Sequence, residues 1–174
     1  MSKYVSLLRG VNVGGRNIKM TDLTDCYVNI GLTDIKAYLQ SGNVTFYSEA
    51  TNIDFIKTKL ELVVSKSFSF PAKIFVLGED KLKTIVEKYP FDMTDNSYQY
   101  YVIFTEDDLA TNLYNQGIGL KSQLDSIALG DDVVYWKVLK GMTVKSPFSK
   151  LLVKSEFKDF HTNRNIKTLA KILS

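Results

Sequence analysis

The sequence predicts an α+β fold made of two tandem halves that repeat one order of elements. Short β-branched and aromatic runs alternate with segments of helical period, and turn residues separate them. The order strand–helix–strand–strand–helix then begins again after Gly78. Completed by a fourth strand, this order is the ferredoxin-like split βαβ unit. We expect residues 1–77 to form the first half, 78–97 to connect, and 98–174 to form the second half.

The first half contains every element of that unit. Thr21 is expected to cap its first helix and Gly31 to end it, while Asn52 is expected to cap the second helix. Ser41-Gly42 separates two β-rich runs and is typical of a hairpin turn. The expected strands cover residues 4–8, 35–40, 43–47 and 72–77.

The order of these elements brings distant loops together. In a ferredoxin-like unit, the loop after the first strand, the hairpin turn and the loop into the fourth strand share one end of the sheet. The glycine-rich segment after Leu8 should therefore face the turn at 40–43 and, less closely, residues 68–71. Two polar loops that are far apart in sequence are expected to converge.

The second half follows the same order less regularly. A helix over 79–89 is expected to stop at Pro90. Thr105 is expected to cap a later helix at 107–116. We expect the last strand of this half to be missing or very short, and the half to end in a helix. The remaining expected elements are strands at 98–104, 127–129 and 133–138 and helices at 148–157 and 166–173.

Composition describes a folded globular chain and excludes several classes of protein. The 174 residues are 45% hydrophobic and carry a net charge of +3, which is too small to argue by itself for nucleic acid. No apolar run approaches the ~20 residues that span a bilayer, and the first residues do not resemble a signal peptide. Cys26 is the single cysteine, so no internal disulfide can form. We expect a cytoplasmic protein in which Cys26 is structural.

One glycine-rich, basic segment stands out at residues 7–20, between an apolar strand and a helix. Glycines let backbone N–H groups turn toward one point, and nearby cations favour a negative charge there. The segment is not a nucleotide-binding P-loop, because Arg16-Asn17 replaces the lysine and hydroxyl residue that such a loop requires. A tight strand-to-helix turn explains the glycines equally well. As an anion site, its candidate residues are Arg9, Gly10, Asn12, Gly14, Gly15, Arg16 and Asn17, with Lys19 adding charge.

The turn at 40–43 faces this segment in the expected fold. Gln40, Ser41 and Asn43 carry amide and hydroxyl groups that donate and accept hydrogen bonds. We expect these groups to select the rest of the ligand.

A second polar segment precedes the last helix. Thr162, Arg164 and Asn165 offer a second anion contact, and His161, the single histidine, is a candidate general acid or base. The alternative is an ordinary helix N-cap with solvated charges. The sequence leaves both interpretations open.

Residue types argue against other site chemistries. One cysteine and one histidine cannot form a structural zinc site, and no carboxylate pair has a spacing suited to Ca²⁺. We expect no metal and no cofactor. For single-stranded nucleic acid, Tyr4 and one aromatic residue of the 43–47 strand are candidates for base stacking, but the octapeptide signature of RNA-binding sheets is absent. We expect the second half to cover these apolar residues instead.

Three blocks of the sequence belong to one pattern: residues 8–23, residues 38–46, and the tail with Thr162, Arg164 and Asn165. Together they closely resemble the bacterial family known as domain of unknown function 1697. The resemblance implies two ferredoxin-like halves and an unassigned function. One departure is Ile166, where the family usually has tryptophan.

We therefore expect a cytoplasmic binding module for an anionic or phosphorylated small ligand or nucleotide at the glycine-rich segment. One alternative is an enzyme that acts on such a ligand through His161. The other is a weak binder of single-stranded nucleic acid, which the low net charge disfavours. No membrane partner is expected.

Overall fold

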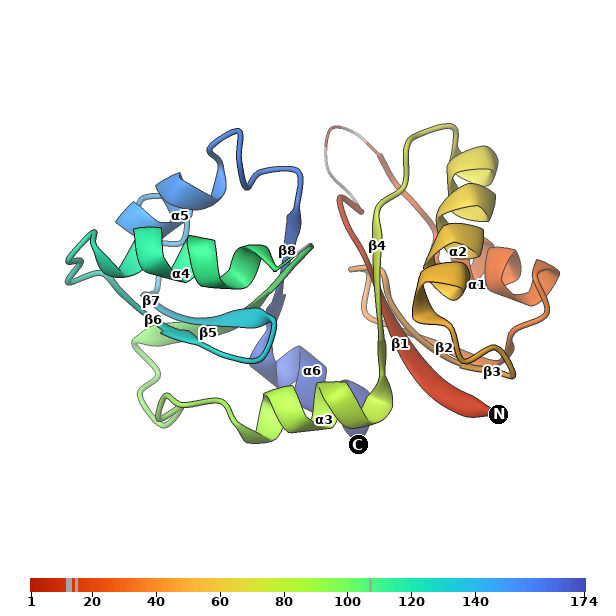
Figure 1. Cartoon of the computed structure of the whole chain (residues 1–174), viewed down its shortest axis with the longest axis horizontal. Coiled ribbons are helices and arrows are strands. Elements are labelled where there is room, and N and C mark those ends of the chain that lie inside the picture. The colour runs from red at the N-terminus through yellow and green to blue at the C-terminus, as the bar shows by residue number, and fades with distance from the viewer. Residues whose placement is uncertain (12–13, 15, 107) are drawn as a thin grey trace. The chain divides into compact units, whose positions relative to one another are not determined.

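The computed structural model describes residues 1–11, 14, 16–106 and 108–174. These residues form two four-stranded antiparallel sheets with helices packed on them (Figure 1). The chain divides into two units, Met1–Leu82 and Lys83–Ser174, with one sheet in each. The α+β class predicted from the sequence is confirmed.

The elements of the first unit are, in chain order, β1 (Ser2–Leu8), α1 (Met20–Asn29), β2 (Thr33–Tyr38), β3 (Asn43–Ser48), α2 (Ile53–Phe68) and β4 (Ile74–Gly78). They form a sheet with the strand order β2-β3-β1-β4. β1 lies in the middle and is antiparallel to both β3 and β4. Helices α1 and α2 cover one face of this sheet (Figure 1).

The core of the first unit lies between this face and the two helices. Tyr4 and Phe46 are paired across β1 and β3, and their ring centroids are 5.8 Å apart. Tyr27 of α1 meets Phe46 edge-on at 5.6 Å. Its hydroxyl lies 2.8 Å from Ser6 Oγ, so two buried polar groups satisfy each other. Burial raises the pKa of the Tyr27 phenol, which therefore stays neutral.

Of the three helix ends predicted from the sequence of the first unit, two are confirmed and one is wrong. The Asn52 side chain accepts a hydrogen bond from the first turn of α2 at 2.9 Å, and Gly31 follows α1 with φ +84°, so both predictions are confirmed. Thr21 as N-cap is wrong. Helix α1 begins two residues earlier than this cap implies, with Lys19 at the N-cap, and the Thr21 hydroxyl donates to Asp22 instead.

The hairpin turn packs directly on the end of β1. β2 begins and ends two residues earlier than the expected 35–40, so the turn comprises residues 39–42. Gly42 has φ +69°, and a Cβ on it would lie 2.6 Å from Val11 Cγ2 and 2.9 Å from Leu8 Cβ. Only glycine fits both this backbone conformation and this close approach.

The second unit begins within α3 (Glu79–Glu87), which crosses the boundary between Leu82 and Lys83. The elements that follow are β5 (Tyr98–Thr105), α4 (Leu109–Ile118), β6 (Asp125–Leu129), β7 (Val133–Leu139), α5 (Pro147–Leu152), β8 (His161–Asn165) and α6 (Ile166–Leu173). Their sheet order, β6-β7-β5-β8, repeats the order of the first unit.

The core of the second unit is built around Trp136 of β7, which is 1% exposed. Its ring lies 5.3 Å from Tyr101 of β5 and 5.6 Å from Phe148 of α5, measured between centroids. Helices α4 and α5 cover this face of the sheet (Figure 1). Gly117 of α4 allows close packing, because a Cβ there would lie 2.5 Å from Ile127 Cδ1 and 2.9 Å from Phe148 Cδ2.

The prediction that the last strand of the second half is missing or very short is wrong. Residues 161–165 form β8, which pairs antiparallel with β5 and has five residues, as many as β4. Its sequence is polar throughout, without the apolar alternation by which a strand is recognised. β8 lies at an edge of the sheet, where the backbone ladder to one neighbour is sufficient.

Two helix predictions in the second half also need correction. Helix α5 ends at Leu152, whereas a helix was expected over 148–157. Phe148 and Phe157 are both buried in one core, but a continuous helix would put residues nine apart on opposite sides, about 180° around its axis. Thr105 is not an N-cap. Its backbone pairs with β8 as the last residue of β5, and α4 begins only at Leu109.

A first prediction concerns the close approach at Gly42. We expect Gly42→Ala to lower the free energy of unfolding by about 1–3 kcal/mol more than Gly31→Ala. Both glycines have positive φ, but nothing lies within 4 Å of a Cβ at Gly31, so the difference isolates the contact with Leu8 and Val11. Chemical denaturation followed by far-UV circular dichroism measures it. Equal losses in the two variants would contradict the close approach.

A second prediction uses two glycines at the end of α4. We expect Gly117→Ala to destabilise the protein by about 1–3 kcal/mol, because overpacking outweighs the gain in helix propensity. Gly119 has φ −70°, and a Cβ there would make only an ordinary contact, at 3.6 Å from the Gln116 carbonyl oxygen, so Gly119→Ala should stabilise by about 0.4–1 kcal/mol. The same denaturation experiment compares them, and the two changes should have opposite signs.

Candidate functional site

The candidate site begins where β1 ends. The Leu8 amide donates to the carbonyl of Gly42 at 2.8 Å, and the Arg9 amide donates to the carbonyl of Lys73 at 2.9 Å. The backbone at the end of β1 is therefore hydrogen-bonded to the hairpin turn through Leu8 and to the residue before β4 through Arg9. The predicted convergence of the glycine-rich segment with the turn is confirmed.

The glycine-rich segment has left-handed backbone at both of its described glycines. Gly10 has φ +71° and Gly14 has φ +65°. The interpretation of these two glycines as turn residues that need positive φ is therefore confirmed. The predicted ligand residues Asn12 and Gly15 lie outside the described residues.

Arg16 is held in place by an aromatic ring from the loop that follows α2. Its guanidinium carbon lies 4.2 Å from the centroid of the Phe70 ring. Its Nη1 atom is 3.6 Å from the position that a Cβ on Gly10 would take, so the guanidinium runs beside the Gly10 backbone. A cation–π contact at an exposed side chain contributes about 0.5–1 kcal/mol. The contact also limits the rotamers of Arg16, which lowers the entropic cost of using its charge.

A depression of about 510 Å³ lies beside this segment. Residues from the end of the segment and the start of α1 form most of its lining, and one residue of the hairpin turn completes it: Asn17, Lys19, Met20, Thr21 and Gln40. Met20 and Thr21 belong to the first turn of α1, whose backbone N–H groups carry the positive end of the helix dipole. Asp22 in the same first turn reduces that positive potential.

The hairpin residues divide into one that lines the depression and two that shape the turn. Gln40 is exposed and lines the depression. Asn43 is fully buried, and its amide donates to the Tyr38 carbonyl at 3.3 Å and to Ser41 Oγ at 2.7 Å. These bonds connect the two ends of the turn and fix the position from which Gln40 projects.

The second polar segment is strand β8 and the start of α6, in the second unit. Asn165 Oδ1 accepts a hydrogen bond from the Lys167 amide at 2.9 Å, so Asn165 is the N-cap of α6. The Thr162 hydroxyl is buried and accepts a hydrogen bond from Arg164 at 2.7 Å. The ordinary N-cap interpretation of this segment is confirmed for Asn165.

Two titratable side chains of this segment, Arg164 and His161, form hydrogen bonds with backbone carbonyl groups. Arg164 also donates to the Asn163 carbonyl at 2.7 Å. Although the residue is partly exposed, burial of its guanidinium lowers the pKa of Arg164 to about 10, so the group remains charged at neutral pH. His161 Nδ1 lies 2.8 Å from the Phe157 carbonyl, and because a carbonyl only accepts, Nδ1 carries the proton.

Two of the aromatic residues considered for base stacking, Tyr4 and Phe46, belong to the core. Tyr4 is 5% exposed and its hydroxyl donates to the Ala50 carbonyl at 3.1 Å. Phe46 is fully buried between Tyr4 and Tyr27. Neither ring presents a face on which a base can stack.

Two contributions to the site were missed at the level of sequence. Phe70 was included only as part of a loop expected to lie nearby, because a single aromatic residue before a proline has no pattern that marks it as a partner of Arg16. Thr21 was assigned to a cap, whereas it lines the depression together with Met20. A helix start two residues earlier would have indicated this position.

Metal and membrane sites find no support in the part of the chain that the structure describes. It contains no cluster of three or more histidine, cysteine or acidic residues that is able to hold a metal ion. Cys26 is buried and is a free cysteine. Its thiol lies 3.3 Å from the Asp22 carbonyl oxygen. Among the described helices, none has the length and hydropathy of a membrane-spanning helix.

Solved structures support the fold over the whole chain. A conserved bacterial protein from Streptococcus pneumoniae, SP0830, is 25% identical and has a TM-score of 0.82, over 99% of this chain and 97% of that one. An unknown protein from Galdieria sulphuraria is 9% identical over 99% of this chain and 91% of that one, but its TM-score of 0.28 supports no argument. No curated protein matches the chain.

The sequence resemblance agrees with the profile of one protein family. The family described as "Protein of unknown function (DUF1697)" matches residues 1–135, which include the glycine-rich segment, the hairpin and the start of β7. The tail with Thr162, Arg164 and Asn165 lies outside the matched range. Since the match covers well over half of the chain, the protein belongs to the DUF1697 family.

Proposed function

We propose that the protein binds an anionic or phosphorylated small molecule or nucleotide at the glycine-rich segment. The observation that carries the proposal is the depression of about 510 Å³ in the first unit. Its lining combines Lys19 and Asn17, at the end of the segment, with Gln40 of the hairpin turn. A ligand there would meet a cation, two side-chain amides and the first N–H groups of a helix, which together suit an anion with further polar groups.

Arg16 supplies the second positive charge in this proposal. The Phe70 ring holds its guanidinium beside the Gly10 backbone, so the charge is oriented before any ligand arrives. Pre-oriented groups cost less entropy on binding than mobile ones. Asp22 opposes the anion electrostatically, and we expect moderate affinity for this reason.

We also propose that both units have a ferredoxin-like fold and that the protein is cytoplasmic. Each unit has the order βαββαβ and the corresponding sheet order, which support a ferredoxin-like assignment for both halves. The single buried cysteine supports a reducing environment, from which we infer a cytoplasmic location.

A third prediction tests the role of Arg16. We expect inorganic pyrophosphate to shift the amide NMR signals around Gly10 and Gln40, and Arg16→Ala to weaken its binding about tenfold, because a charge-assisted hydrogen bond is lost. Lys88→Ala removes an exposed cation in the other unit and should leave binding unchanged. A panel of nucleotides and sugar phosphates in a thermal-shift assay then identifies the class of ligand. Absence of any shift, or equal effects of the two variants, would contradict the proposal.

A fourth prediction concerns a substitution that should strengthen anion binding instead of weakening it. Asp22→Asn should strengthen pyrophosphate binding about two- to threefold, because it removes a like charge from the first turn of α1. Asp54→Asn makes the same change in the first turn of α2 and serves as the matched control. Titration of both variants by NMR at low salt measures the effect. If the two variants bind equally, the start of α1 does not take part in anion binding.

A further inference from the structure

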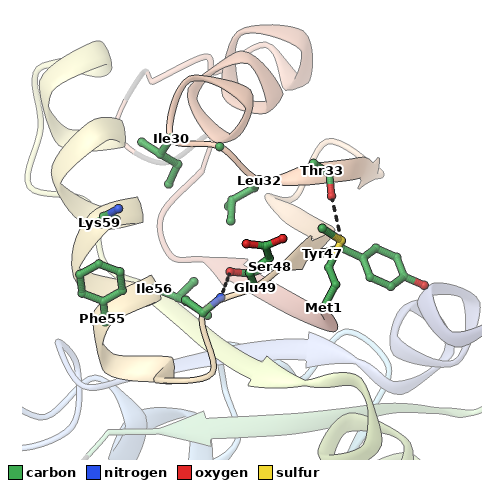
Figure 2. A pocket seen from close by; sticks show the side chains of 12 residues that line it. Met1, Ile30, Leu32, Thr33, Tyr47, Ser48, Glu49, Phe55, Ile56 and Lys59 are labelled. Atoms are coloured by element: carbon green, nitrogen blue, oxygen red, sulfur yellow. Dashed lines mark hydrogen bonds between the residues drawn. The ribbon is translucent and has the colours of Figure 1, made fainter.

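A second cavity, of about 460 Å³, lies in the first unit. Figure 2 shows Phe55 and Lys59 of α2 on one side, Met1, Thr33 and Tyr47 on the other, and Glu49 between them. The end of α1 and the residues before β2 complete the lining. A volume of this size is in the range of small-molecule sites.

The cavity is separate from the glycine-rich segment. It includes Met1 and Ser48, and Ser48 pairs with Ser2 at the start of β1. The glycine-rich segment follows the other end of β1, where Leu7 pairs with Asn43. Leu7 lies five positions after Ser2 along β1, about 17 Å away at the usual rise of 3.3–3.4 Å per residue.

The interior of the cavity is apolar. Leu32 and Ile56 belong to the core and are 9% and 3% exposed. Ile30 and Ala50 are partly buried and pack against the same core. These four side chains form a surface on which an aliphatic group of a ligand can be buried.

Two of the three side-chain hydroxyl groups that line the cavity, those of Ser48 and Thr33, have partners. Ser48 Oγ accepts a hydrogen bond from the Ala50 amide at 3.1 Å. The Thr33 hydroxyl lies 3.5 Å from Met1 Sδ. The polar side-chain groups that remain for a ligand are therefore the Tyr47 hydroxyl and the charged groups.

One acidic and one basic side chain lie on this cavity, and they do not pair with each other. Within residues 1–11, 14, 16–106 and 108–174, no ion pair involves Glu49 or Lys59. The Lys59 ammonium instead lies 4.6 Å from the centroid of the Phe55 ring. The cavity thus offers a carboxylate, an ammonium group and an apolar interior at separate points.

We propose that this cavity binds a free α-amino acid with an apolar side chain. The ligand's ammonium group would pair with Glu49, its carboxylate with Lys59, and its side chain would cover Leu32 and Ile56. Charge complementarity on both groups selects a zwitterion over a simple amine or acid. For a ligand of this size we expect a dissociation constant on the order of 1 mM.

The first arm of the test varies the ligand. In NMR titrations of the labelled protein, free leucine should shift the amide signals of Gly31, Ser48 and Ala50. The amine 3-methylbutylamine and the acid 4-methylpentanoate each lack one charge and should bind at least about threefold more weakly. Glycine lacks the side chain and should not bind measurably. Leucine that causes no shift, or that binds no better than the amine or the acid, would overturn the proposal.

The second arm varies the protein. Glu49→Gln and Lys59→Gln should each weaken leucine binding at least about threefold, and both side chains are exposed, so folding should be preserved. Lys66→Gln changes the same charge on the same helix outside the cavity and should have no effect. Ala50→Leu fills the cavity and should abolish binding, with circular dichroism to verify the fold. Equal weakening by Lys59→Gln and Lys66→Gln would overturn the assignment.

Discussion

The hydrogen bond from the Leu8 amide to the Gly42 carbonyl fixes the geometry of the candidate site. It joins the end of the central strand to the hairpin turn, and the absent Cβ of Gly42 lets Leu8 and Val11 approach the turn closely. On the other side, the next amide of the chain is bound to Lys73, just before β4. The glycine-rich segment therefore leaves the sheet from a point held on both sides, and Gln40 is carried on the same hairpin.

The two units use one strand order for different chemistry. β4 and β8 occupy the same edge position in their sheets, but β4 is apolar and contributes Ile74 to the core, whereas β8 is polar. The side chains of Thr162 and Arg164 bind each other along β8, and Asn165 caps the helix that follows. In the second unit, polar residues that the sequence suggested as ligand-binding residues thus form hydrogen bonds that stabilise β8 and the start of α6. In the first unit, polar residues of the glycine-rich segment and of the hairpin turn instead line a depression.

The features that could be predicted from the sequence are those in which a single residue determines the local backbone. Asn52 caps a helix and Gly31 ends one because their side chains, or the lack of one, determine the local backbone. The convergence of the two loops was predictable because strand order fixes which loops share an end of the sheet. Features set by packing were not predictable: α5 stops early so that Phe157 can reach the core, β8 forms from a polar sequence, and Phe70 meets Arg16 from a distant loop.

The burial of Trp136 determines how the folding of this protein can be observed. It is the single tryptophan of the chain, it lies in the core of the second unit, and no described residue accepts a hydrogen bond from its indole nitrogen. A dry apolar environment shifts indole fluorescence to shorter wavelength, so emission reports the second core alone. Circular dichroism, in contrast, reports the helices of both units. Comparing the two signals for a variant of Gly42, in the first unit, distinguishes cooperative unfolding of the whole chain from independent unfolding of each unit.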